Sequence, residues 1–125
     1  MNTIIIDFDG TCVTHDYPRV GKDIGAVPVL KKLIDAGHQL ILFSMRSDKE
    51  QQDAVDWFAK NNIPLYGINI NPDQLSWTKS NKAYAQLYID DASLGCPLIY
   101  DTKIARRPFV DWVKVEEILK LKGLL

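Results

Sequence analysis

An apolar run that ends in two carboxylates is the feature that most constrains how this chain can fold. Ile4–Ile6 leads directly into Asp7-Phe8-Asp9-Gly10-Thr11. A short run of β-branched residues bounded by glycine predicts a buried strand rather than a helix. Because side chains alternate along a strand, Asp7 and Asp9 are expected to leave it on the same side. Two neighbouring carboxylates repel each other there, so the pattern also predicts a cation at the end of the strand.

The remainder of the chain alternates between patterns typical of helices and of strands. Helices are predicted from about Val27 to Ala36, from about Asp48 to Asn61, over a short stretch from Asn81 to Gln86, and from Pro108 onward. Further strands are predicted at Gln39–Phe43, Leu65–Ile70, Leu87–Ile89 and Leu98–Tyr100. This alternation predicts one α/β domain spanning residues 1–125, with a three-layer Rossmann-like fold in which helices flank a central parallel sheet on both faces.

Polar side chains follow three of the predicted strands. Asp7 and Asp9 follow the first, Ser44 the second, and Asp90-Asp91 the fourth. In open parallel sheets, ligands bind beyond the carboxyl ends of the strands, so these groups are expected to share one edge. Carboxylate and hydroxyl oxygens without a His or Cys cluster favour Mg²⁺ over zinc or copper. Such a site suits phosphate chemistry, in which an aspartate can act as a covalent nucleophile.

These residues resemble the four motifs of the haloacid dehalogenase superfamily of phosphatases. Asp7-Phe8-Asp9-Gly10-Thr11 is similar to the first motif, Ser44 to the second, a downstream lysine to the third and Asp90-Asp91 to the fourth. The resemblance covers essentially the whole chain. It implies a haloacid dehalogenase-like fold and a Mg²⁺-dependent phosphatase that hydrolyses a phosphomonoester through an aspartyl-phosphate intermediate.

The resemblance also implies a role for each acidic residue. Asp7 is the expected nucleophile and a metal ligand. Asp9 is the expected general acid and base, and it would bind the metal through its backbone carbonyl. Asp90 is expected to bind the metal directly or through water, with Asp91 assisting. Ser44 is expected to donate a hydrogen bond to the phosphoryl group.

The remaining predicted site residues contact the substrate or its phosphoryl group. Lys82 is the preferred third-motif lysine, because its spacing to the acidic pair resembles that of small family members, and Lys79 is the alternative. Gly10 and Thr11 are expected at the substrate-binding turn. Arg46 is expected either to grip a second anionic group of the substrate or to be ion-paired or solvated.

Composition excludes several other classes of protein. Lys plus Arg (15) nearly balance Asp plus Glu (16), so the chain lacks the basic footprint of a protein that binds nucleic-acid duplexes. No apolar run is long enough to span a bilayer and no signal peptide is evident, which predicts a cytoplasmic protein with no membrane partner. Cys12 and Cys96 lack metal-ligand spacing and are expected to be reduced thiols. His15 and His38 have no partner in sequence and are expected to be ordinary loop residues.

The connections between the motifs are too short to contain a sizeable cap domain. An open site is therefore expected, or one covered by a neighbouring subunit in a homo-oligomer. The expected substrate is a small-molecule or polymer-end phosphate ester. Two alternatives remain at this stage: a catalytically silent phosphate-binding module, and a phospho-accepting receiver-like domain. A receiver would carry its acceptor after the third strand, where this chain has Asn69-Ile70-Asn71.

Overall fold

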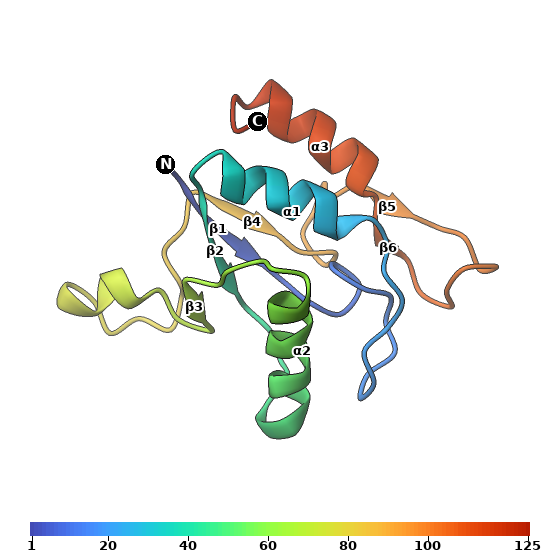
Figure 1. Cartoon of the computed structure of the whole chain (residues 1–125), viewed down its shortest axis with the longest axis horizontal. Helices are drawn as coiled ribbons and strands as arrows, with labels where there is room; N and C mark the ends of the chain where they lie inside the picture. The colour runs from blue at the N-terminus through green and yellow to red at the C-terminus, as the bar shows by residue number, and fades with distance from the viewer.

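A four-stranded parallel sheet organises the protein, in the strand order β3-β2-β1-β4. The computed structural model describes all residues from 1 to 125. The strands are β1 (Thr3–Ile6), β2 (Gln39–Leu42), β3 (Gly67–Ile68) and β4 (Leu87–Ile89). Strand β1 pairs with both β2 and β4, which places it in the interior of the sheet (Figure 1). The predicted parallel sheet is confirmed, although the third strand is shorter than predicted.

All three α-helices pack into one large core on a single face of the sheet. They are α1 (Ala26–Asp35), α2 (Asp48–Lys60) and α3 (Trp112–Leu121). This core takes Ile4 and Ile6 from β1 together with Phe8. Ile5, which points the other way, belongs to a separate small cluster. The bounds of α1 and α2 differ by at most one residue from the helices predicted at 27–36 and 48–61.

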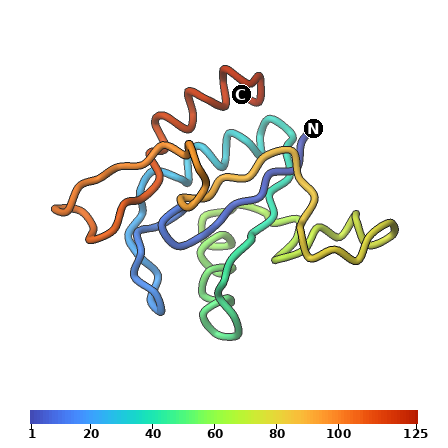
Figure 2. The backbone as a smooth tube through the Cα atoms, turned by 180° about the vertical axis from the view of Figure 1, so that it is seen from behind, coloured from blue at the N-terminus to red at the C-terminus, as the bar shows by residue number.

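On the opposite face of the sheet, the segment around Ala83 takes the place of an α-helix. Its small cluster of buried residues contains Ile5, Ile41 and Ala83, and the connection between β3 and β4 forms only a 3₁₀ helix, η1 (Pro72–Ser76). Viewed from behind, the strands cross the near side of the molecule and this connection projects to one edge (Figure 2). The prediction of a sheet flanked by helices is right, but the expected α-helical layer on the second face is absent.

The helix predicted at Asn81–Gln86 is wrong, and the side chain of Gln74 explains why. Its Nε2 donates to the carbonyls of Ser80 and Lys82, and its Oε1 accepts from the Tyr84 N–H at 2.7 Å. Gln74 is 3% exposed. A buried side-chain amide thus satisfies the backbone groups that a helix would have paired internally.

The C-terminal region forms a ribbon before its helix begins. Strands β5 (Leu98–Ile99) and β6 (Phe109–Val110) pair antiparallel to each other, outside the main sheet. The final helix begins at Trp112 rather than at Pro108, because β6 occupies the intervening residues and the Asp111 side chain caps the helix by accepting from the Lys114 N–H. None of the helices has the length and apolar character needed to cross a membrane.

Candidate active site

The carboxyl ends of β1 and β4 bring three acidic side chains together. Oxygen atoms of Asp7, Asp90 and Asp91 all lie within 4.8 Å of one another. Strands β1 and β4 are parallel neighbours, with Ile6 opposite Ile89, so the residues that follow them emerge at the same edge. The predicted meeting of the first and fourth motifs is therefore present in the structure. Asp9 is not part of this cluster.

The Thr11 hydroxyl forms hydrogen bonds with two of these carboxylates. Its hydroxyl lies 2.8 Å from Asp7 Oδ2 and 3.2 Å from Asp91 Oδ1, and it accepts a hydrogen bond from the Asp91 backbone N–H at 3.0 Å. Trp112 Nε1 donates to the Thr11 carbonyl at 2.7 Å. Because Thr11 is fully buried, it positions the acidic cluster and does not reach a substrate, which corrects the prediction that it binds one.

Gly10 is required by close packing around the same cluster. Its φ of +81° lies in the left-handed region, and a Cβ at this position would overlap His15 Nε2 and Asp91 Oδ2. Gly10 is buried, so its predicted role in substrate binding is also replaced by a structural one.

We therefore expect Gly10→Ala to displace His15 and Asp91 and to lower the free energy of unfolding by roughly 1–3 kcal/mol. Thermal denaturation monitored by circular dichroism would measure the loss. Gly37→Ala is the matched control, because Gly37 also has a positive φ, of +91°, but its Cβ would have nothing within 4 Å. An equal loss in both variants would show that backbone strain alone, rather than the crowded site, accounts for the effect.

The electrostatics of the cluster favour a bound cation. Burial, followed by the nearby charge of Asp90, raises the pKa of Asp7 from 3.8 to about 8, and the hydrogen bond from Thr11 opposes this shift. Burial also raises the pKa of Asp90. No lysine or arginine forms an ion pair with Asp7, Asp90 or Asp91, and the His15 ring contacts Asp91. A divalent cation would supply the missing positive charge.

His15 is a site residue that the sequence analysis missed. Its Nε2 lies 2.8 Å from Asp91 Oδ2, and its side chain is 16% exposed. The loop after β1 folds back over the acidic cluster through bridges that join Val13 to both Asp9 and Asp23. The glycines of this loop indicate a turn, but no residue pattern in the sequence indicates that His15 returns to the end of β4.

Arg46 binds Asp9 in a buried ion pair with two hydrogen bonds. Arg46 Nε donates to Asp9 Oδ2 at 2.8 Å, and Arg46 Nη2 donates to Asp9 Oδ1 at 2.7 Å. Both carboxylate oxygens of Asp9 therefore accept hydrogen bonds from the guanidinium. The ion pair fixes the position of Asp9, whose role as general acid and base stays a prediction.

The other groups around Arg46 correct its predicted contact with substrate. Its remaining N–H groups donate to the backbone carbonyls of Pro18, Arg19 and Glu50, and its side chain is 1% exposed. The guanidinium also lies 5.1 Å from the centre of the Phe8 ring. Of the two predicted alternatives for Arg46, contact with substrate or an ion pair, the structure shows the ion pair. Arg46 links the loop after β1 to the start of α2.

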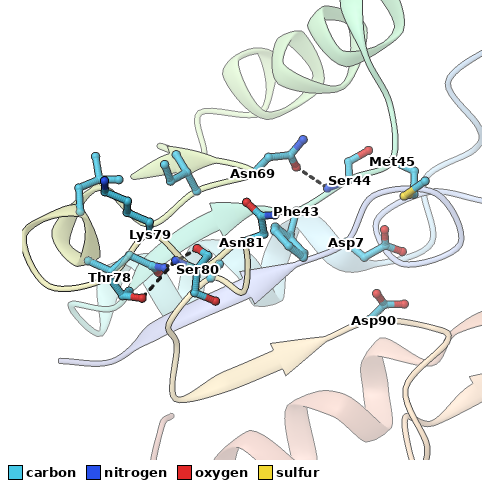
Figure 3. Close-up of a pocket in the computed structure, with 14 residues that line it drawn as sticks. Asp7, Phe43, Ser44, Met45, Asn69, Thr78, Lys79, Ser80, Asn81 and Asp90 are labelled. Carbon is cyan, nitrogen blue, oxygen red and sulfur yellow. Dashed lines mark hydrogen bonds between the residues drawn. The ribbon is translucent and has the colours of Figure 1, made fainter.

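A cleft of about 530 Å³ opens beside the acidic cluster. Asp7, Asp90 and Ser44 line it near the end of the sheet, as Figure 3 shows. The Ser44 backbone N–H donates to Asn69 Oδ1 at 2.8 Å, and Ser44 Oγ accepts from the Arg46 N–H at 2.9 Å. The Ser44 hydroxyl proton remains available to a ligand in the cleft.

The two candidate lysines differ in position. Both are exposed, but Lys79 lines the cleft and Lys82 does not. Figure 3 shows Lys79 at the opposite end of the cleft from Asp7 and Asp90. The preference for Lys82 over Lys79 is therefore reversed as far as lining the cleft is concerned, and neither lysine forms an ion pair with Asp7.

Comparisons with known proteins identify a close structural relative. No family model and no curated protein matches the chain. A solved structure, described as that of a conserved protein coded by a locus from Bacteroides thetaiotaomicron, is 35% identical in sequence and superposes with a TM-score of 0.78. The match covers 97% of this chain and 91% of the other. The chain therefore belongs to the same protein family as this conserved Bacteroides protein.

Proposed function

We propose that the protein is a Mg²⁺-dependent phosphatase of the haloacid dehalogenase type, with Asp7 as its nucleophile. The observation that carries the proposal is the cluster of Asp7, Asp90 and Asp91 at the ends of two adjacent strands, without a lysine or arginine partner. Ser44 follows the neighbouring strand β2 and lines the same cleft as Asp7. A partly buried nucleophile beside a hydrogen-bond donor and an oxygen-rich cation site suits phosphoryl transfer.

The residues present fit a hard divalent cation. All three clustered side chains offer oxygen ligands, as Mg²⁺ requires. The raised pKa of Asp7 reflects negative charge and burial that a cation would compensate. Asp7, Asp90 and Asp91 would hold the ion, which when bound would neutralise charge between the carboxylates and an incoming phosphate.

The proposed reaction has two displacement steps at phosphorus. In the first, an oxygen of Asp7 attacks phosphorus and the bond from phosphorus to the ester oxygen breaks; the alcohol leaves with a proton supplied by Asp9, and Asp7 becomes an acyl phosphate. In the second, water attacks phosphorus, inorganic phosphate leaves, and the Asp7 carboxylate is restored. In this step we propose that Asp9 takes up a proton from that water and that the Ser44 hydroxyl donates to a phosphoryl oxygen.

The direct test of this function is phosphate release from 4-nitrophenyl phosphate in Mg²⁺ and in EDTA. We expect turnover that requires the metal, and a loss of about 10²-fold in kcat for Ser44→Ala, since one donor to the transferring group is removed. Ser93→Ala, which changes an exposed serine outside the cleft, is the control. No turnover across a panel of phosphate esters would contradict the proposal, and a stable phosphoprotein without turnover would favour the receiver-like alternative.

Metal binding is expected to depend on pH because of Asp7. With a pKa of about 8 in the absence of a cation, Asp7 is largely protonated at pH 6–7 and must lose its proton when it ligates a metal. The affinity for Mg²⁺ should therefore rise about tenfold per pH unit up to pH 8 and level off above it. Isothermal titration calorimetry in two buffers of different ionisation enthalpy would detect the released proton. Affinity that is constant from pH 6 to 8 would contradict this expectation.

A further inference from the structure

Two further cavities lie next to each other beside the acidic cluster, and one of them is lined by arginines. Asp7, Asp90, His15, Tyr17 and Arg107 are among the residues that line a cavity of about 450 Å³ over the acidic cluster. A neighbouring cavity of about 580 Å³ is lined by His15, Asp16, Tyr17, Arg19, Arg106 and Arg107. We call the cavity of about 580 Å³ the arginine groove. His15, Tyr17 and Arg107 belong to both linings, so the two cavities are contiguous.

The arginines of this groove differ in how their charges are compensated. Arg19 forms a bidentate ion pair with Asp16. Arg106 and Arg107 are exposed, and neither forms an ion pair with the protein. The groove therefore carries two uncompensated guanidinium groups next to a cluster of carboxylates.

The fold holds these two arginines beside the loop that follows β1. They precede β6 on the ribbon, and the N–H of Val110 in β6 donates to the Gly10 carbonyl at 3.0 Å. The tip of the ribbon and the loop after β1 project on the same side of the molecule in both views (Figures 1 and 2). This backbone hydrogen bond joins β6 to the turn after β1, close in the chain to both Arg107 and Asp7.

We propose that the arginine groove binds a second phosphate group of the substrate. This inference rests on the proposed phosphatase function and names its substrate class: a small phosphomonoester that carries a further phosphate. Guanidinium groups match phosphate oxygens in geometry and charge. Tyr17, which is 59% exposed and lines both cavities, offers an aromatic face to a flat ring between the two phosphates. The scissile phosphate lies at Asp7 and the second phosphate at Arg106 and Arg107.

The test compares two esters that differ by one phosphate, adenosine 5′-phosphate and adenosine 3′,5′-bisphosphate, in Mg²⁺. We expect wild-type kcat/KM to favour the bisphosphate at least tenfold, and the ratio to fall to about one in the double variant Arg106→Gln/Arg107→Gln. Lys103→Gln is the control, because it removes a positive charge from the same ribbon connection without lining either cavity. A wild type without the preference, or an equal fall in the Lys103 variant, would overturn the proposal.

A binding measurement separates this inference from the proposed function. Calorimetric titration of adenosine 3′,5′-bisphosphate into Asp7→Asn, with and without the two arginine substitutions, requires no turnover. We expect at least a tenfold weaker affinity when both arginines are replaced. If this loss of affinity is found but the wild-type protein hydrolyses no ester, the phosphatase function is refuted and the anion site is supported. Equal affinities would refute the anion site even in an active phosphatase.

Discussion

Asp7→Asn is expected to lower the rate of phosphate release by about 10⁴-fold or more, because it removes the proposed nucleophile while keeping its size. An asparagine can still accept the hydrogen bond that Thr11 donates to Asp7 Oδ2. Steady-state release of phosphate from 4-nitrophenyl phosphate in Mg²⁺ would measure the loss. Asp35→Asn, at an exposed position at the end of α1, should retain full activity. Turnover in Asp7→Asn at a rate close to the wild type would remove Asp7 from the mechanism.

The same substitution is expected to stabilise the protein when no metal is bound. The folded-state pKa of Asp7 is raised from 3.8 to about 8, so its ionisation opposes folding increasingly as the pH rises from about 4 to about 8. Asparagine carries no such charge. At pH 8 in EDTA we expect Asp7→Asn to be more stable by on the order of 3 kcal/mol, and this gain should vanish near pH 4. A variant less stable than the wild type at pH 8 would contradict the raised pKa.

The second large effect is on stability. Arg46→Ala is expected to lower the free energy of unfolding by about 3–5 kcal/mol, because it leaves a partly buried carboxylate without its counter-charge. Asp9 would lose both hydrogen bonds from the guanidinium, and the carbonyls of Pro18, Arg19 and Glu50 would lose a donor. Chemical denaturation in urea would measure the loss.

A second arginine provides a matched comparison for Arg46. Arg19 also pairs with an aspartate through two hydrogen bonds, but its side chain is 74% exposed, against 1% for Arg46. Exposed ion pairs contribute less than about 1 kcal/mol, so Arg19→Ala should have little effect. If both substitutions cost the same, Arg46 would not be the structural link between the loop after β1 and α2.

The sequence was sufficient to predict the elements whose pattern is local. The run Ile4–Ile6 is hydrophobic at every position because β1 has a neighbour on each side and is buried on both faces. The helix at Asp48–Lys60 follows a serine and carries acidic residues in its first turn. The connection between β3 and β4 was not predictable in this way, because the buried amide of Gln74 binds backbone groups up to ten residues further along the chain.

The same distinction between local patterns and long-range contacts applies to the candidate site. Asp7 and Asp90 could be placed together because parallel strands deliver their carboxyl ends to one edge of the sheet. The partners of Arg46 and His15 could not, because each pairs with a residue on a different segment, Asp9 and Asp91 respectively. Such contacts depend on how loops return across the fold, and a single sequence carries no periodic pattern for them.

The central claim is that Asp7 itself carries the phosphoryl group during turnover, and chemical trapping tests it most directly. An acyl phosphate on aspartate is reduced by borohydride to homoserine, so acid quenching during turnover, reduction and peptide mass mapping would report on each aspartate separately. We expect homoserine at position 7 alone, only when both Mg²⁺ and substrate are present. Turnover without homoserine at position 7, or with homoserine at another aspartate, would contradict the account.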